Sequence, residues 1–170
     1  CVVMGVGGRV QQEVCRPVCV DKDIPILRRL SGGGTVVLGP GCLCFSLVLG
    51  FEQFPELKDL KKSYCNLMNR VASALSPLCP GISMQGICDL AIKNPDHDEF
   101  QKVSGNTQRR TKYGVLHHGT LLYNFDLGLI SEILPQPPKM PDYRQQRQHS
   151  RFVTQLQTTQ NELVLALKTE

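Results

Sequence analysis

Two stretches of the sequence contain residue types that can do chemistry, and the first is RRLSGGGTVVLG. It places two arginines and a serine directly before three consecutive glycines: Arg28, Arg29, Ser31, Gly32, Gly33 and Gly34. A glycine-rich turn between strands exposes backbone N–H groups that can converge on a phosphate or a carboxylate. Arg29 can add a bidentate guanidinium contact to the same anion. A glycine-rich hairpin without a ligand is the alternative that this stretch leaves open.

The second stretch is KVSGNTQRRTKYGVLHHGTLL, in which a lysine precedes small residues on an expected strand. The ammonium of Lys102 can reach a site bounded by Ser104 and Gly105. A lysine beside a carboxyl-phosphate group stabilises the negative charge that develops on its oxygens. His117 and His118 alternate faces of the strand, so at most one of them points into a given pocket. An exposed lysine and a hydrogen-bonded structural histidine are the plainer alternatives.

Length and composition limit the classes of protein to consider. The chain of 170 residues is long enough to bury a core and of a size typical for one domain. Its formal net charge of +4 suits an anionic ligand or an acidic partner, whereas nucleic-acid-binding proteins usually carry a denser basic face. No apolar run approaches the roughly 18 residues of a membrane span, and we see no signal-peptide pattern. We therefore predict no nucleic-acid partner, no membrane association and a cytoplasmic location.

The cysteines and the familiar nucleotide motifs add no chemistry of their own. The chain has eight cysteines but no C-x-x-C pair, so we predict reduced structural thiols and no metal site. VVMGVGGRV looks like a dinucleotide fingerprint, but Val10 stands at the third glycine position and Pro17 interrupts the helix that should follow. A P-loop and a G-x-S-x-G elbow are both absent from the sequence.

The elements that would position these residues follow from periodicity and turn chemistry. We predict strands over 2–4, 24–30, 35–38, 42–49 and 87–92, a loop over 77–86, and successive strands within 101–125. We predict a helix over 55–76, a short helix capped by Asp126 through Leu134, an extended segment over 135–143, and a final helix over 161–170 opened by a Thr159–Glu162 capping box. This order indicates an α+β fold with a mixed, largely antiparallel sheet flanked by helices.

Taken in order, these motifs resemble the catalytic domain shared by lipoate–protein ligases, octanoyl transferases and biotin–protein ligases. The lipoate–protein ligase branch is the most similar, with the pattern R-R-x-S-G-G-G-[AT]-V, D-L, K-[IV]-S-G-x-[AT] and H-H-G-T-L-L. In this chain those elements stand at 28–36, 89–90, 102–107 and 117–122. The resemblance extends from about residue 2 to 156 and implies a single catalytic domain over 1–170 with the class II synthetase-related fold.

The resemblance also implies an activity and its participants. Such enzymes join lipoate or octanoate to ATP as an acyl-adenylate, release pyrophosphate and pass the acyl group to a lysine of a lipoyl domain. ATP and Mg²⁺ would be the cofactors, although we name no metal ligand. The acceptors would be lipoyl domains of 2-oxoacid dehydrogenase complexes or the glycine-cleavage H protein.

Site residues carry over from the matched motifs. Lys102 would be the catalytic residue, and Val36 and Val103 would line the acyl chain. The acyl and adenylate groups would be bound by residues of the glycine stretch, the K-V-S-G strand and the histidine pair: Arg29, Ser31, Gly32, Gly33, Gly34, Ser104, Gly105 and His118. Arg29 would hold phosphate oxygens.

Some features depart from the family pattern and keep alternatives open. Leu38, Gly39 and Cys42 stand where many ligases carry the His, Asp and Asn of H-D-x-G-N. We expect that an amino-terminal segment and a carboxyl-terminal accessory domain of the family are missing, so a fragment, an enzyme needing an accessory polypeptide and a non-catalytic binding paralogue are alternatives. Another is a cysteine-dependent octanoyl or lipoyl transferase that uses an acyl-carrier protein, with Cys79 as its nucleophile and Cys88 as the second candidate.

Two basic stretches are assigned to the surface. Arg109, Arg110 and Lys112 would suit the acidic surface of a lipoyl domain, with a solvated strand face as the plainer reading. DYRQQRQHSRFVTQL contains three arginines and a histidine in one run, and we predict a rim element near the acceptor side.

Overall fold

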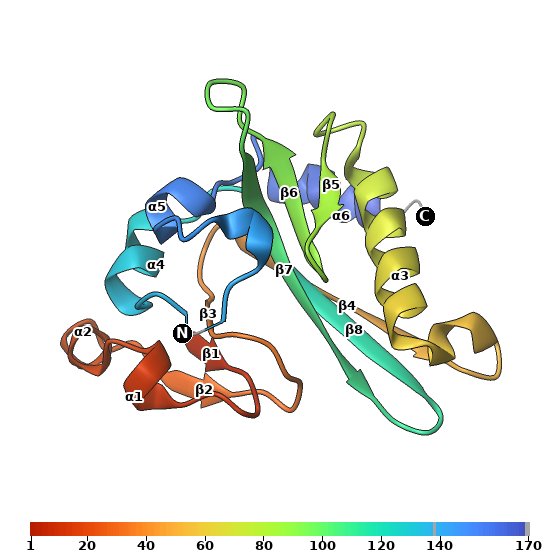
Figure 1. The fold of residues 1–170 in the computed structure, drawn as a ribbon, viewed down its shortest axis with the longest axis horizontal. Helices are drawn as coiled ribbons and strands as arrows, with labels where there is room; N and C mark the ends of the chain where they lie inside the picture. The colour runs from red at the N-terminus through yellow and green to blue at the C-terminus, as the bar shows by residue number, and fades with distance from the viewer. Residues whose placement is uncertain (138, 169–170) are drawn as a thin grey trace.

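Two β-sheets form the framework of the computed structural model, which describes residues 1–137 and 139–168 (Figure 1). The larger sheet is antiparallel with strand order β4-β8-β7-β6-β5. Its strands are β4 (Cys42–Gly50), β5 (Ser83–Gln85), β6 (Asp89–Lys93), β7 (Phe100–Arg110) and β8 (Gly114–Leu122). In the smaller sheet β1 (Val2–Met4) pairs in parallel with β2 (Ile26–Arg28) and antiparallel with β3 (Val36–Val37). The predicted α+β class with a largely antiparallel sheet is confirmed.

Helices cover both faces of the larger sheet. On one face lie η1 (Pro55–Lys58), α3 (Leu60–Leu75) and α6 (Gln160–Lys168). The other face carries the smaller sheet together with α1 (Val10–Glu13), α2 (Arg16–Asp21), α4 (Leu127–Ile133), η2 (Asp142–Arg144) and α5 (His149–Phe152). The larger sheet therefore lies between two layers, as Figure 1 shows, and an apolar cluster lies on each side of it.

Alternation along β8 shows how the sheet serves both layers. Leu121 is fully buried and packs in a cluster with Met68 and Leu75 of α3 and Leu163 of α6. Its neighbour Leu122 packs in the other cluster, which includes residues of the small sheet and α4. Successive side chains of a strand point to opposite faces, so this one dipeptide contributes to both cores. Each fully buried leucine contributes about 1.5–3 kcal/mol to folding.

The helix predicted over 55–76 is divided in the structure. Residues Pro55–Lys58 form the 3₁₀ turn η1, and α3 begins only at Leu60. Asp59 is the reason, because its side chain accepts a hydrogen bond from the backbone N–H of Lys62 at 2.7 Å and caps the new helix. Leu60, expected on the buried stripe, is 53% exposed at the first position of α3.

Other boundaries also differ from the sequence prediction. The strands expected over 24–30 and 35–38 shorten to β2 and β3. A strand, β5, forms inside the predicted 77–86 loop, because the turn after it allows the chain to pair back with β6, and Ile87 is exposed in that turn instead of opening a strand. The segment expected to be extended over 135–143 includes residue 138, which lies outside the described residues, and it turns into η2 from Asp142.

Both predicted caps are present. The Asp126 carboxylate accepts from the N–H groups of Gly128 and Leu129 and opens α4. The Thr159–Glu162 capping box opens α6, with reciprocal side chain to backbone hydrogen bonds of 2.8 and 3.3 Å. Residues 169–170 of the predicted final helix lie outside the described residues.

The eight cysteines are all in the described residues, and all are free thiols. Across 1–137 and 139–168, no helix combines the length and the apolar character needed to cross a bilayer.

Candidate active site

The glycine stretch folds against the small sheet and is held by Arg29. The Arg29 guanidinium donates to the carbonyl oxygens of Val3, Gly32 and Gly34 at 3.0, 2.6 and 2.7 Å, and its Nε donates to the Ser31 hydroxyl at 3.2 Å. Burial lowers the pKa of this guanidinium from its ordinary value, because its charge loses hydration. Hydrogen bonds to these backbone carbonyls replace part of the lost hydration.

Close backbone approach explains why side chains are excluded from this loop. A Cβ on Gly5 would lie 2.1 Å from the carbonyl oxygen of Gly33, which is closer than atoms can approach. Gly33 itself has φ +85°, a conformation that glycine adopts at little cost. The glycines thus let the loop lie directly on the turn that follows β1.

The loop is also tied to the larger sheet. The Ser31 hydroxyl and Nε2 of His118 on β8 are 2.7 Å apart, and the Thr107 hydroxyl donates to the Gly32 carbonyl at 3.2 Å. Burial, and secondly the Arg29 charge, lowers the pKa of His118. His117 points to the opposite face, where it is fully buried and 3.3 Å from the Gln108 amide. His118 is therefore the histidine that faces the loop.

Removal of the Arg29 guanidinium should loosen this arrangement. We expect Arg29→Gln to lower the free energy of unfolding by about 2 kcal/mol, because three carbonyls lose a charged donor. Urea denaturation followed by circular dichroism would measure the effect, with the exposed Arg16→Gln as the charge-matched control. Equal stability of the two variants would contradict the role of Arg29 as the organiser of the loop.

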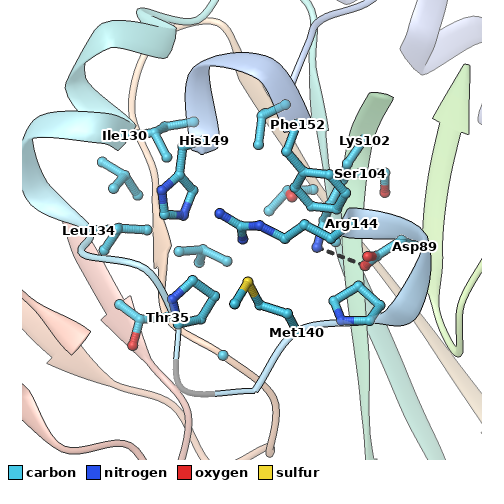
Figure 2. A pocket seen from close by; sticks show the side chains of 18 of the residues that line it. Thr35, Asp89, Lys102, Ser104, Ile130, Leu134, Met140, Arg144, His149 and Phe152 are labelled. Atoms are coloured by element: carbon cyan, nitrogen blue, oxygen red, sulfur yellow. Dashed lines mark ion pairs between the residues drawn. The ribbon is translucent and has the colours of Figure 1, made fainter. Parts of the chain in front are cut away.

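A cavity of about 450 Å³ opens between the end of the glycine loop, the start of β6, the first half of β7 and the segment from α4 to α5 (Figure 2). Much of its wall is apolar and includes the two valines expected to line an acyl chain: Val36, Val37, Val103, Leu122, Ile130, Leu134, Met140 and Phe152. Of the predicted site residues, the lining includes Gly34, Lys102, Ser104 and Gly105. The described lining does not include Arg29, Ser31, Gly32, Gly33 or His118, which belong to the hydrogen-bonded loop and its support.

Lys102 is anchored at the polar end of the cavity. Its Nζ lies 2.7 Å from Oδ1 of Asp89 on the neighbouring strand β6, and Figure 2 shows this pair beside Ser104. The other oxygen of Asp89 accepts a hydrogen bond from the Tyr143 hydroxyl at 2.9 Å. The absence of a side chain at Gly105 leaves room for the lysine, because a Cβ there would be 3.1 Å from Nζ. Asp89 thus holds the ammonium at the surface of the cavity.

Sequence reasoning assigned no individual role to the basic side chains on the opposite wall. Arg144 and His149 belong to the run predicted as a rim element, yet both line the cavity. The guanidinium of Arg144 extends between Phe152 and Met140 in Figure 2 and lies over the Phe152 ring at 4.7 Å. The pKa of His149 is lowered to about 4, mainly by burial and then by the charges of Arg144 and Lys102. The run DYRQQRQHSRF has no periodicity that would have marked these two side chains as facing inward.

The remaining arginines of the two basic stretches serve the fold or face solvent. Arg147 is buried and bonds the Glu99 carboxylate and the carbonyls of Phe100 and Tyr143. Arg110 donates to the carbonyls at the end of η1 and stacks on Phe51. The proposed acceptor surface is thus reduced in the structure to exposed residues such as Arg109.

The two candidate nucleophilic cysteines have different surroundings. Cys88 lines the cavity, and its thiol donates to the Asn106 carbonyl at 2.9 Å. Burial, and then the Asp89 carboxylate, raises the pKa of Cys88 to about 11. Cys79 packs against the core cluster of α3, where burial raises its pKa as well. Neither thiol is activated in this structure, and only Cys88 of the two reaches the cavity.

The positions that depart from H-D-x-G-N form the turn into β4. Val36 and Val37 line the cavity, whereas residues 38–42 are not among its described lining. Within the described chain we also find no cluster of three or more His, Cys, Asp or Glu side chains arranged to hold a metal ion.

Residues 1–165 match the model of the lipoyl protein ligase A/B catalytic domain, and the chain belongs to this family. The family assignment made from the sequence motifs is therefore confirmed.

Solved structures show the same fold. A bipartite lipoate protein ligase from Thermoplasma acidophilum, described with its E2 lipoyl domain, matches with a TM-score of 0.79 and 21% identity over 99% of this chain and 64% of that chain. LipL1 of P. falciparum in complex with lipoate matches with a TM-score of 0.71 and 19% identity, over 98% and 42%. A lipoate-protein ligase A bound with ATP matches with a TM-score of 0.68 and 22% identity, over 98% and 65%. The chain thus spans less than two thirds of the length of these proteins.

Proposed function

We propose that this chain activates lipoate or octanoate with ATP and transfers the acyl group to a lysine of a lipoyl domain. The observation that carries the proposal is the cavity beside the glycine loop, where apolar walls end at Lys102, Asp89 and Arg144. An apolar channel that ends in fixed cations suits a fatty acyl chain with a carboxylate or phosphate at its end. The structural relatives described with lipoate and with ATP support the same choice.

The proposed reaction has two steps. A carboxylate oxygen of the acid attacks the α-phosphorus of ATP, so an O–P bond forms while the bond to the leaving pyrophosphate breaks. The neutral amine of the acceptor lysine then attacks the acyl carbon, AMP leaves with the C–O bond electrons, and the amine proton passes to solvent. The Lys102 ammonium would stabilise negative charge on the acyl and phosphate oxygens in both steps.

The other predicted site residues keep their proposed roles in this scheme. Gly34, Ser104 and Gly105 would border the acyl and adenylate groups directly. Ser31, Gly32, Gly33 and His118 would act by holding the loop in shape. The phosphate contact predicted for Arg29 stays a prediction, since the hydrogen bonds that its guanidinium makes in this structure are to the loop itself.

The implied participants are ATP, Mg²⁺ and a lipoyl domain. The cavity fits an anionic ligand, because Lys102, Lys139 and Arg144 are among its lining residues. We assign no residue to Mg²⁺. The two carboxylates among the described lining of the cavity are Asp89 and Glu13, and both already interact with other protein groups. The E2 lipoyl domain described with the Thermoplasma ligase supports a lipoyl domain as the acceptor. The cytoplasmic location predicted from the sequence stays a proposal.

The test is an acylation assay read by mass spectrometry. The protein is incubated with lipoate or octanoate, Mg-ATP and an apo lipoyl domain, beside a tube without ATP. We expect the acceptor to gain one acyl group only when ATP is present, and pyrophosphate to be released. An acceptor that is never acylated, together with no pyrophosphate release, would contradict the proposal.

A cysteine-dependent acyl transferase is the second candidate, because Cys88 lines the same cavity. Its thiolate would attack an acyl-carrier thioester, release the carrier thiol and then pass the acyl group to the acceptor lysine. Octanoyl-carrier protein without ATP tests this reaction, with Cys88→Ala and Cys79→Ala as paired variants. We expect no transfer, because the raised pKa of Cys88 leaves little thiolate at neutral pH. Transfer that is lost only in Cys88→Ala would establish the transferase instead.

A further inference from the structure

A buried amide connects two residues of the cavity wall. Asn106 lies on β7 and is 8% exposed, and its Nδ2 donates to the Cys88 carbonyl and to the Ser104 hydroxyl, both at 2.9 Å. Cys88 and Ser104 belong to the described lining of the cavity, whereas Asn106 does not. Asn106 would therefore influence a bound ligand through the residues that it holds.

The link to Cys88 extends the connection between β6 and β7. The ladder of these strands ends at the pair Asp89–Gly105, and Cys88 is the last residue of the turn that precedes β6. Besides the side-chain bond, the Cys88 thiol donates to the backbone carbonyl of Asn106 at 2.9 Å. Two hydrogen bonds thus fasten the turn to β7 at the residue directly before Asp89. The course of the backbone into Asp89 is therefore set in part by Asn106.

Asp89 passes this placement on to Lys102. The Asp89 side chain is buried, and its Oδ1 lies 2.7 Å from Nζ of Lys102. Because an aspartate side chain is short, a shift of the backbone at Cys88 would move the carboxylate and the ammonium that it holds. Ser104, the other partner of the amide, lies beside Lys102 in Figure 2. One amide thus holds two neighbours of the ammonium.

The other end of the amide is unfavourable for folding. Its Oδ1 is buried and has no hydrogen-bond partner among the described residues. A Cβ on Gly119, which pairs with Asn106 from β8, would lie 1.8 Å from that oxygen, so the amide fits only opposite a glycine. A buried acceptor without a partner opposes folding, and departures of this kind are expected at functional sites. Stability alone does not account for an amide at this position.

We infer that Asn106 is a positioning residue for the proposed reaction. It fixes the turn at Cys88, so that Asp89 holds the Lys102 ammonium where negative charge develops. The inference rests on the proposed function and deepens it, because it adds a residue outside the described lining that sets the position of the catalytic lysine. A misplacement of about 1 Å in a catalytic group can reduce a rate about a hundredfold. Loss of the amide should therefore slow the chemical steps and leave the affinity for the substrates unchanged.

The test is single-turnover acylation of an apo lipoyl domain at varied lipoate and Mg-ATP, read by mass spectrometry. Asn106→Ala removes the amide, and Asn106→Leu removes it while filling a similar volume, with circular dichroism to report that each variant is folded. We expect both to lower the rate at saturation about ten- to one-hundredfold and to leave the half-saturating concentrations within about twofold. Asn69→Ala is the control, because the Asn69 amide is also a donor but is exposed on α3. It should keep the wild-type rate.

Combination with Lys102→Ala separates positioning from a general structural role. If Asn106 acts through Lys102, adding Asn106→Ala to Lys102→Ala should slow the reaction by less than about threefold. The inference is overturned by an equal loss in both backgrounds, since the amide would then act independently of the ammonium. A wild-type rate in both Asn106 variants, raised half-saturating concentrations at an unchanged rate, or failure of both variants to fold would overturn it as well.

The proposed function survives each of these outcomes, because the wild type still acylates its acceptor in all of them. A wild type that neither acylates the lipoyl domain nor releases pyrophosphate would overturn the proposed function, and the inference with it.

Discussion

Replacing Lys102 by alanine is expected to reduce the rate of ATP-dependent acylation by about two to three orders of magnitude. The Lys102 ammonium lies 2.7 Å from Asp89 at the polar end of the cavity. There it would stabilise the negative charge that develops on the acyl and phosphate oxygens. Removal of one preorganised charged donor typically costs a rate factor of that size. Lys102→Ala also leaves the buried Asp89 carboxylate without its cation, so some loss of stability is expected, and circular dichroism of the variant is measured beside its rate.

Single-turnover acylation of an apo lipoyl domain, read by mass spectrometry, measures the effect. Lys93→Ala is the matched control, because Lys93 is an exposed strand lysine that pairs with Asp98 outside the cavity lining. We expect Lys93→Ala to keep the wild-type rate. If Lys102→Ala keeps that rate as well, the ammonium has no part in charge stabilisation and the proposed mechanism is wrong.

The second large effect concerns stability. Gly41→Ala is expected to lower the free energy of unfolding by about 4 kcal/mol, from an unfavourable positive φ and from overpacking. Gly41 has φ +81°, and a Cβ there would lie 1.9 Å from the carbonyl oxygen of Asn124. The Gly41 carbonyl also accepts from the N–H groups of Tyr123 and Asn124. The backbone that would have to move therefore joins the start of β4 to the end of β8.

Urea denaturation followed by far-ultraviolet circular dichroism gives the comparison, since the chain has no tryptophan. Gly39→Ala is the control in the same turn, because its Cβ would meet only Phe125, at an ordinary contact distance of 3.5 Å. We expect Gly39→Ala to change stability by less than about 1 kcal/mol. Similar stability of the two variants would refute the steric argument at Gly41.

Local chemistry made much of the fold predictable from the sequence. The strand patterns of β4, β7 and β8, the cap at Asp126 and the capping box at Thr159 depend on neighbouring residues only, and the structure has them all. Where a local signal was overlooked, the prediction was wrong. Asp59 caps α3, which begins five residues after Pro55, and the short β5 depends on pairing with β6.

The site was predictable as a set of motifs but not as an arrangement. The sequence identified the glycine stretch and Lys102, because residue type and spacing along single strands carry that information. Contacts between distant segments decide that Arg144 and not Arg147 lines the cavity. They also decide that Cys88 and not Cys79 does so. Arg29 turns into its own loop because the carbonyls of Val3, Gly32 and Gly34 surround it.

Taken by itself, the sequence determined the family, the strand order along the chain and the residues able to carry charge into a site. Only the tertiary structure placed Arg144 and His149 opposite Lys102, and Cys88 but not Cys79 in the cavity lining. The physical reason is that the segment from α4 to α5 has few regular elements of its own. Its side chains are oriented by packing on Phe152 and by hydrogen bonds to β6 and to the turn between β6 and β7. Such long-range contacts leave no periodic signal in the sequence.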